Sequence, residues 1–219
     1  MPAVSVTAAL NRGLRRVPTG LIWLLGCVPA VWLTWLLFTG GLGVDPVAVY
    51  ERELGLIALQ FLLASLCITP ILRWSGVNLI RFRRALGVLG FGYAALHLLV
   101  WVVLDKQFLW AEMGRDIIRR PFITVGMLAF LLLIPLALTS TDRALRHLGG
   151  HAWRRLHLLA LPATVLAAAH YLLVVKSWPI EPILYLAAAL ALVGLRLFWH
   201  LRARTRRHSA PGRAENVPS

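Results

Sequence analysis

The sequence is poor in cysteine and in acidic residues. Its two cysteines, Cys27 and Cys67, form no C-x-x-C pair. They cannot supply a thiolate metal site by themselves, so we expect both to pack as small apolar side chains. Nine Asp and Glu residues stand against 23 Lys and Arg, which gives a formal net charge of +14. Because no nucleic-acid-binding module accompanies this charge, we expect no nucleic-acid partner and assign the basic residues to anionic lipid headgroups.

Nucleotide-binding motifs are also missing. The chain contains neither a G-x-G-x-x-G fingerprint nor a Walker motif, so we expect no covalently attached nucleotide-binding domain. It also lacks the C-x-x-C-H motif that attaches haem covalently,. Redox chemistry in this chain would therefore need electrons from another molecule and a cofactor held without covalent bonds.

Apolar residues dominate what is present, at 59% of the chain. Six apolar runs are long enough to cross a hydrocarbon core of roughly 30 Å as helices. They cover about residues 20–39, 54–72, 85–104, 122–140, 156–175 and 183–200. The first run is longer than a signal-peptide core and has no convincing cleavage site after it, so we expect it to be retained. The sequence predicts an all-α membrane protein whose six-transmembrane-helix bundle spans residues 20–201.

The basic residues set the expected orientation. With the N-terminus inside, 17 of the 23 Lys and Arg residues fall on the cytoplasmic side of the six runs. Because translocation of basic residues is disfavoured, this arrangement is preferred over its reverse. We predict that both termini are cytoplasmic, with a basic segment at residues 1–19 and a disordered basic tail at residues 202–219.

Of the seven histidines, His97, His157 and His170 carry the functional argument. An ionisable side chain within a span is costly and tends to face the bundle interior, where it can also simply hydrogen-bond a neighbouring helix. His97 and His170 lie about 18 Å and 21 Å along two parallel helices, and so at similar depth. Because neutral imidazole is a suitable axial ligand for haem iron, we predict that this pair holds a non-covalent haem b.

Small residues precede both histidines at helical spacing. They are Gly87, Gly90 and Ala94 before His97, and Ala163 and Ala167 before His170. Such residues normally let helices approach closely. Because each stripe ends in a histidine at matched depth, we predict a gap between the two helices that admits a flat porphyrin.

His157 belongs to a different place in the bundle. It lies roughly 20 Å from His170 along the helix axis, so one haem cannot take both residues as ligands. The sequence therefore predicts a separate site for His157 at the cytoplasmic boundary.

Two stretches carry a family resemblance: "RFRRALGVLGFGYAALHLL" around His97, and "WRRLHLLALPATVLAAAHYLLVVK" around His157 and His170. With the six helices, they resemble the MsrQ (YedZ) family, haem-binding membrane subunits of bacterial periplasmic methionine sulfoxide reductase systems. More broadly, the chain is similar to the ferric reductase-like transmembrane domain. The resemblance implies an electron conduit in the bacterial inner membrane. Electrons would come from a cytoplasmic flavin reductase with its flavin, or from quinone, and would reach the periplasmic molybdenum-containing subunit MsrP.

The resemblance also implies that MsrP reduces methionine sulfoxide in envelope proteins and that the membrane chain itself makes or breaks no substrate bond. Two-haem relatives carry a second histidine on the helix of His97, where this sequence has Arg83 or Arg84. His157 would therefore serve either a second haem with an unusual opposite ligand or a flavin, FMN, whose phosphate binds these arginines. The same arginines also fit the positive-inside rule without any ligand.

Other functions remain open at this stage. A ferric reductase or a quinone-linked cytochrome b would use the same histidine pair with another acceptor. A haem-free transporter or scaffold is disfavoured because the spans lack the acidic residues of many proton relays and show no repeat of halves.

Overall fold

The computed structural model describes residues 2–175, 177 and 179–208, and these residues form helices joined by short turns. Six helical segments are long and apolar enough to cross a membrane, which confirms the predicted all-α bundle. These spans are α2 (Thr19–Thr39), α3 (Pro46–Ser75), η1 with α4 and η2 (Ile80–Asp105), α6 (Pro121–Leu138), α7 with η3 and α8 (Asp142–Val174), and α9 (Ile180–Arg202 of the helix Ile180–His208).

The second span begins earlier than residue 54, where the apolar run starts. Pro46 occupies the first turn of α3, and the Asp45 side chain accepts a hydrogen bond from the backbone N–H of Ala48 at 3.2 Å. Proline and a capping aspartate both favour a helix start. The polar residues of the first turns, including Glu51, hid this part of the helix from a hydropathy argument.

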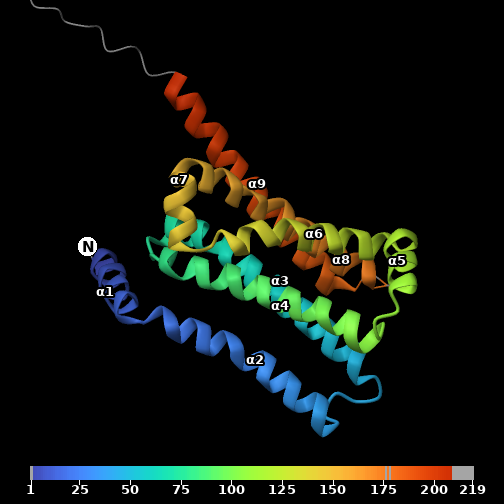
Figure 1. Cartoon of the computed structure of the whole chain (residues 1–219). Coiled ribbons are helices and arrows are strands. Elements are labelled where there is room, and N and C mark those ends of the chain that lie inside the picture. The colour runs from blue at the N-terminus through green and yellow to red at the C-terminus, as the bar shows by residue number, and fades with distance from the viewer. Residues whose placement is uncertain (1, 176, 178, 209–219) are drawn as a thin grey trace, which may run out of the picture.

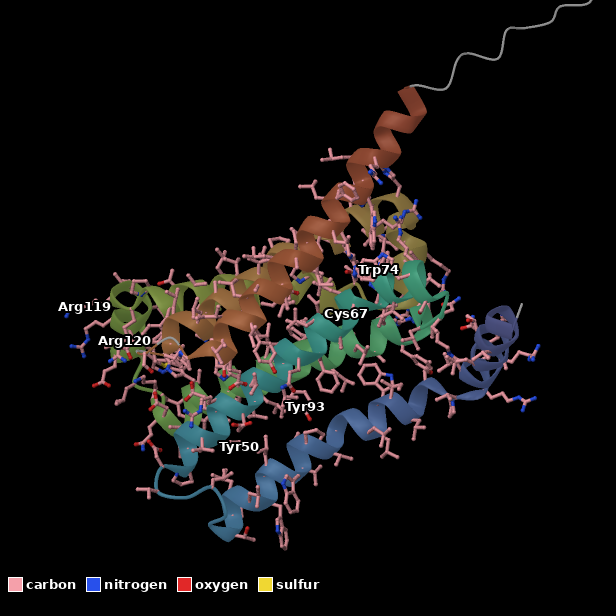
Figure 2. The ribbon with its side chains drawn as sticks, turned by 180° about the vertical axis from the view of Figure 1, so that it is seen from behind. Tyr50, Cys67, Trp74, Tyr93, Arg119 and Arg120 are labelled. Carbon is pink, nitrogen blue, oxygen red and sulfur yellow. The ribbon has the colours of Figure 1, made fainter. Side chains whose placement is uncertain are left out.

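The shorter helices mark the two ends of the bundle (Figure 1). Helix α1 (Pro2–Arg16) and helix α7 (Asp142–Leu156) lie at one end, called here the α7 end, and helix α5 (Trp110–Arg119) lies at the other, the α5 end. Asn11 ties α1 to the turn after α3, because its side chain donates to the Gly76 carbonyl and accepts from the Asn78 N–H. Figure 2 shows the same division, with Arg119 and Arg120 at the opposite end from Trp74.

Two helix pairs form the centre of the bundle. Helix α4 (Arg83–Val100) packs along α3, and helix α8 (Ala160–Val174) packs along α6, with α9 against α8 and α3. Helix α2 lies at the periphery and exposes large apolar side chains, including Trp35 at 62% and Phe38 at 83%. Such a surface is expected where a helix faces lipid rather than water.

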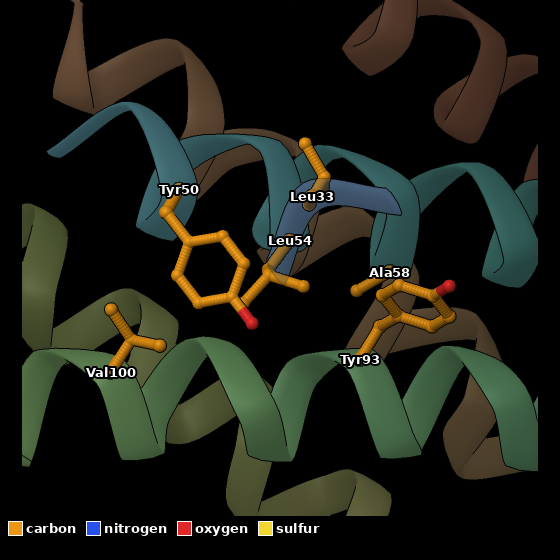
Figure 3. Close-up of a cluster of buried hydrophobic side chains, with 6 residues drawn as sticks. All are labelled: Leu33, Tyr50, Leu54, Ala58, Tyr93 and Val100. Atoms are coloured by element: carbon orange, nitrogen blue, oxygen red, sulfur yellow. The ribbon is translucent and has the colours of Figure 1, made fainter. Parts of the chain in front are cut away.

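A tyrosine hydroxyl connects α2 to the centre. Tyr93 donates to the Gly26 carbonyl at 2.7 Å and accepts from the Ala30 N–H at 2.9 Å, two groups that an uninterrupted helix would pair with each other. Pro29 lies between these positions and disturbs the backbone ladder of α2,. The ring of Tyr93 belongs to a buried cluster with Leu33, Tyr50, Leu54, Ala58 and Val100 (Figure 3).

Two further features lie near the α7 end. Helix α7 is kinked at Gly149, whose φ of 74° and ψ of 150° are not helical, in line with the glycine pair at this point of the sequence. Helix α9 includes residues 202–208, so the tail predicted to be disordered from residue 202 begins inside a helix. Residues 209–219 of that tail lie outside the described part of the chain.

Candidate functional site

A cavity of about 410 Å³ lies between α3, α4, α6 and α8, toward the α5 end. Its volume falls within the range of roughly 300–1,000 Å³ that is usual for cofactor and ligand pockets. The walls are mainly apolar and include Leu59, Leu62, Phe130 and Leu133. The cavity therefore offers a largely apolar ligand a site with mainly apolar walls within the bundle.

His97 on α4 and His170 on α8 enter this cavity from opposite walls. Their ring centroids are 6.1 Å apart, with an angle of 72° between the ring planes. An iron ion bonded to one imidazole nitrogen on each side separates the two ring centres by about 6 Å, because metal–imidazole bonds are about 2 Å long. The distance between the two ring centres thus fits two histidines that are both ligands of one haem iron.

Hydrogen bonds fix the tautomer of both rings. The Nδ1 of His97 lies 2.8 Å from the backbone carbonyl of Glu51, and the Nδ1 of His170 lies 2.7 Å from that of Phe122. A carbonyl oxygen can only accept, so each Nδ1 donates its N–H. The lone pair is then on Nε2, the nitrogen that a metal ion needs, and such hydrogen bonds orient metal-ligating histidines generally.

The small-residue stripes do not line the cavity as predicted. A Cβ added at Gly90 would contact Leu62 and the Ala58 carbonyl, and one at Gly87 would approach Ser65, so both glycines face α3. The prediction was wrong for these two residues because the glycines serve the close packing of α4 on α3.

The alanines of the two stripes divide between the cavity and the packed core. Ala94 and Ala167 do line the cavity. Ala163 is fully buried, with Leu62 and Leu133, toward the α7 side.

Two glycines that the sequence argument missed lie beside the histidines instead. A Cβ at Gly55 on α3 would fall 3.1 Å from the Nδ1 of His97, and a Cβ at Gly126 on α6 would fall 2.8 Å from the Nδ1 of His170. Gly55 lies four positions after Glu51, and Gly126 lies four positions after Phe122. Glu51 and Phe122 are the residues whose carbonyls accept the histidine N–H groups. A search for glycines on the neighbouring helices at the depth of each histidine could have found them.

Charged side chains surround the mouth of the cavity at the α5 end. Lys106 pairs with Asp105 at 3.0 Å and with Asp116 at 3.1 Å, and Arg120 pairs with Asp116 at 3.0 Å. The hydrogen bond from Lys106 lowers the pKa of Asp116, and the hydrogen bonds to Asp105 and Asp116 raise the pKa of Lys106. The network fastens α5 over one side of the mouth.

Removing the central carboxylate should loosen α5. Asp116→Asn is expected to speed hydrogen exchange of the α5 amides, because both ion pairs of this residue are lost. In the unmodified protein the ion pairs stabilise α5 at pH values above about 3.9, the usual pKa of Asp. They weaken as the pH falls through the lowered pKa of Asp116,. The ion pairs of Lys106 are fully present at pH values below about 10.4, the usual pKa of Lys. They weaken as the pH rises through the raised pKa of Lys106,.

The control for this prediction is Glu112→Gln, which removes a carboxylate from the same helix outside the network. Removal of this carboxylate costs only the interaction of a first-turn carboxylate with the helix dipole, so the α5 amides of the variant should exchange at most about fivefold faster than in the unmodified protein. Equal exchange rates in the two variants would show that the ion pairs do not hold α5.

His157 lies away from the cavity, near the α7 end. Its Nε2 is 3.2 Å from the Thr139 hydroxyl, and its ring stacks on Trp153 with centroids 3.8 Å apart. The Trp153 indole N–H donates to the Thr139 carbonyl at 2.9 Å. The structure thus separates His157 from His97 and His170, as the axial distance in the sequence predicted.

The two arginines predicted near His157 behave differently. The exposed Arg84 forms an ion pair with Asp142 at 2.6 Å. The half-buried Arg83 is close enough to interact electrostatically with His157 and with Arg196 on α9. Arg196 donates to the Leu66 carbonyl and to the Thr69 hydroxyl, while its buried Nε has no partner among the described residues. Arg196, which the sequence argument counted among the 17 cytoplasmic basic residues although it lies just within the last apolar run, is a second cation at this place.

Comparison with known proteins decides the family. The ferric reductase like transmembrane component family matches residues 53–168, which include His97 and His157 and end two residues before His170. The chain is 46% identical over 202 residues, or 90% of both chains, to proteins of Brucella ovis, Brucella canis and Brucella suis. Each is named "Protein-methionine-sulfoxide reductase heme-binding subunit MsrQ". The chain belongs to the MsrQ family. No solved structure matches the chain.

Membership in the MsrQ family agrees with the resemblance drawn from the helices around His97 and His170. The name of the relatives describes a haem-binding subunit, and the histidine pair in the cavity is a donor set that suits haem iron,. Among the described residues, no cluster of three or more His, Cys, Asp or Glu side chains offers an alternative metal site.

Proposed function

We propose that the protein is the membrane electron-transfer subunit of a methionine sulfoxide reductase system, and that His97 and His170 hold a haem b in the cavity. The observation that carries this proposal is the pair of imidazoles in one cavity, with ring centroids 6.1 Å apart and with both Nδ1–H groups donated to backbone carbonyls. The relatives, which are named as haem-binding subunits of such a reductase, support it.

When bound, haem supplies an iron that gains and loses one electron at a time. The residues of this chain would bind the haem, orient its ligands and provide its apolar surroundings. His97 and His170 would each offer Nε2 to the iron, because the carbonyls of Glu51 and Phe122 accept from Nδ1,. The mainly apolar walls would limit the contact of the haem with water. Burial of the haem away from water and hydrogen bonds to its histidine ligands are means by which a protein tunes the reduction potential of the iron.

The charge distribution supports one direction of electron transfer. We assign the α7 end to the cytoplasm, because most Lys and Arg residues outside the spans lie there, and the α5 end to the periplasm. Electrons would enter at the α7 end from a flavin reductase or from quinone and leave at the α5 end, where the cavity lies. An acceptor in the periplasm would require the bacterial inner membrane, and we propose that location.

The acceptor is the molybdenum-containing periplasmic subunit MsrP. Conversion of one methionine sulfoxide to the thioether and water consumes two electrons and two protons, so the membrane subunit must deliver two single electrons per sulfoxide. The substrate bond is broken in MsrP, and this chain acts as a relay.

Near the α7 end we assign a flavin site, with FMN as the expected ligand. His157 and Arg83 would contact its phosphate, since guanidinium groups bind phosphate oxygens in pairs. Arg196 adds a second cation to the surroundings of Arg83. Arg84 contributes less than the sequence predicted, because Asp142 already occupies its guanidinium.

The proposal is tested with purified protein in detergent, produced with adequate haem supply. A b-type spectrum should appear on reduction by flavin reductase, FMN and NADH, and the haem should be reoxidised when MsrP and a peptide containing methionine sulfoxide are added. MsrP without the peptide is the control. A colourless protein would overturn the haem assignment. Reoxidation by ferric citrate but not by MsrP would favour a ferric reductase instead.

A further inference from the structure

We propose that Gly55 and Gly126 are positioning residues for the two histidines, because a Cβ at either position would press against the imidazole that reaches a helix carbonyl there. The inference deepens the proposed function, since it rests on His97 and His170 as haem ligands. It assigns a role to two glycines on helices that carry neither ligand.

The geometry of an α-helix explains why glycine is needed. The carbonyl of residue i points toward residue i+4, and the Cα–Cβ bond of residue i+4 tilts back toward the N-terminus of the helix. A side chain at i+4 therefore covers the carbonyl of residue i from the side. A ring on a neighbouring helix can reach that carbonyl oxygen, which has a second lone pair, only if the covering side chain is absent.

Both histidines use this arrangement. His97 donates to Glu51, four residues before Gly55 on α3, and a Cβ at Gly55 would lie 3.1 Å from Nδ1 and 3.3 Å from Cε1 of the ring. His170 donates to Phe122, four residues before Gly126 on α6. A Cβ at Gly126 would lie 2.8 Å from Nδ1 and 2.9 Å from Cε1, closer than real side chains approach.

Other glycines of the described helices do not share this position. Gly90 faces Leu62, Gly26 faces Leu89, and a Cβ at Gly92 would meet nothing within 4 Å. Among the glycines whose surroundings the structure describes, only Gly55 and Gly126 would place a Cβ against a histidine ring. The same device thus occurs twice, once in the α3–α4 pair and once in the α6–α8 pair.

The effect on the cofactor follows from the hydrogen bond. An alanine at Gly126 has no room unless the ring of His170 moves, and movement lengthens the bond from Nδ1 to Phe122. Loss of such a supporting hydrogen bond typically weakens metal binding 10- to 100-fold. We expect Gly126→Ala to release haem at least tenfold faster, and Gly55→Ala to act in the same direction with a smaller effect.

Haem release is measured by transfer from the purified holoprotein to excess apomyoglobin. Gly92→Ala is the matched control, because it adds the same methyl group to a membrane helix in open space, and it should release haem at the unmodified rate. If Gly126→Ala does not fold, Gly55→Ala decides the question. Release from every folded variant at the control rate would overturn the proposal.

A second readout does not need haem. In haem-free protein with isotopically labelled histidine nitrogens, NMR should find His170 protonated on Nδ1, and Gly126→Ala should shift protonation toward Nε2. An unchanged tautomer in Gly126→Ala and Gly55→Ala would contradict the positioning role. A protein that binds no haem but shows these shifts would overturn the proposed function and leave the role of the glycines intact.

Discussion

His170→Ala should abolish the b-type absorption of the purified protein, and His97→Ala should do the same. The two rings lie in the same cavity with their centroids 6.1 Å apart. Neither has a substitute, because no other histidine of the described residues lines the cavity. The measurement is the reduced-minus-oxidised optical spectrum at equal protein concentration, with haem content determined chemically. We expect less than about one tenth of the unmodified haem content, from the loss of a metal ligand.

The matched control is His157→Ala, which removes an imidazole from the same span but outside the cavity. It should retain the haem bound by His97 and His170. Imidazole added to His170→Ala should restore part of the signal, because the deleted side chain leaves a space of its own shape beside the Phe122 carbonyl. Full haem content in either His97→Ala or His170→Ala would contradict the proposed ligand pair.

Arg83→Ala and His157→Ala should each lower FMN affinity by about 10- to 100-fold. A hydrogen bond to a charged group contributes about 1.5–3 kcal/mol, which corresponds to that range. Both residues lie together near the α7 end, and Arg83 has no ion pair among the described residues. The measurement is the flavin released by acid from the purified protein, followed by titration of the flavin-free protein with FMN.

Arg84→Ala is the control for the flavin site. Its guanidinium is occupied by Asp142 at 2.6 Å, so its removal should change FMN affinity less than threefold. A haem content that falls by half in His157→Ala, with flavin unchanged, would show that His157 serves a second haem instead. Unchanged flavin and haem in both Arg83→Ala and His157→Ala would remove any cofactor role from this end of the bundle.

The number of spans and the approximate place of the histidines could be predicted from the sequence. Transfer of a segment into lipid depends on the sum of its own residues, so six apolar runs define six helices without knowledge of their neighbours. The rise of 1.5 Å per residue then gives the depth of each histidine. For this reason the sequence predicted that His97 and His170 share a level and that His157 does not.

Rotation of the helices about their axes could not be predicted in the same way. A membrane helix is apolar on its lipid-facing and its buried sides, so the pattern of residues does not show which face meets which neighbour. The glycine stripe before His97 was therefore assigned to the cavity, although Gly87 and Gly90 face α3. The pairing of Arg84 with Asp142 also depends on how helices 58 residues apart in sequence come together.

The sequence by itself determined an all-α membrane protein with one histidine pair at matched depth, because hydropathy and helical rise are local properties. The tertiary structure alone decided what each imidazole touches. The carbonyls of Glu51 and Phe122, and the space at Gly55 and Gly126, lie on neighbouring helices. Contacts of this kind exist only after the helices pack, since they depend on the rotation and separation of two segments that the sequence of either one leaves free.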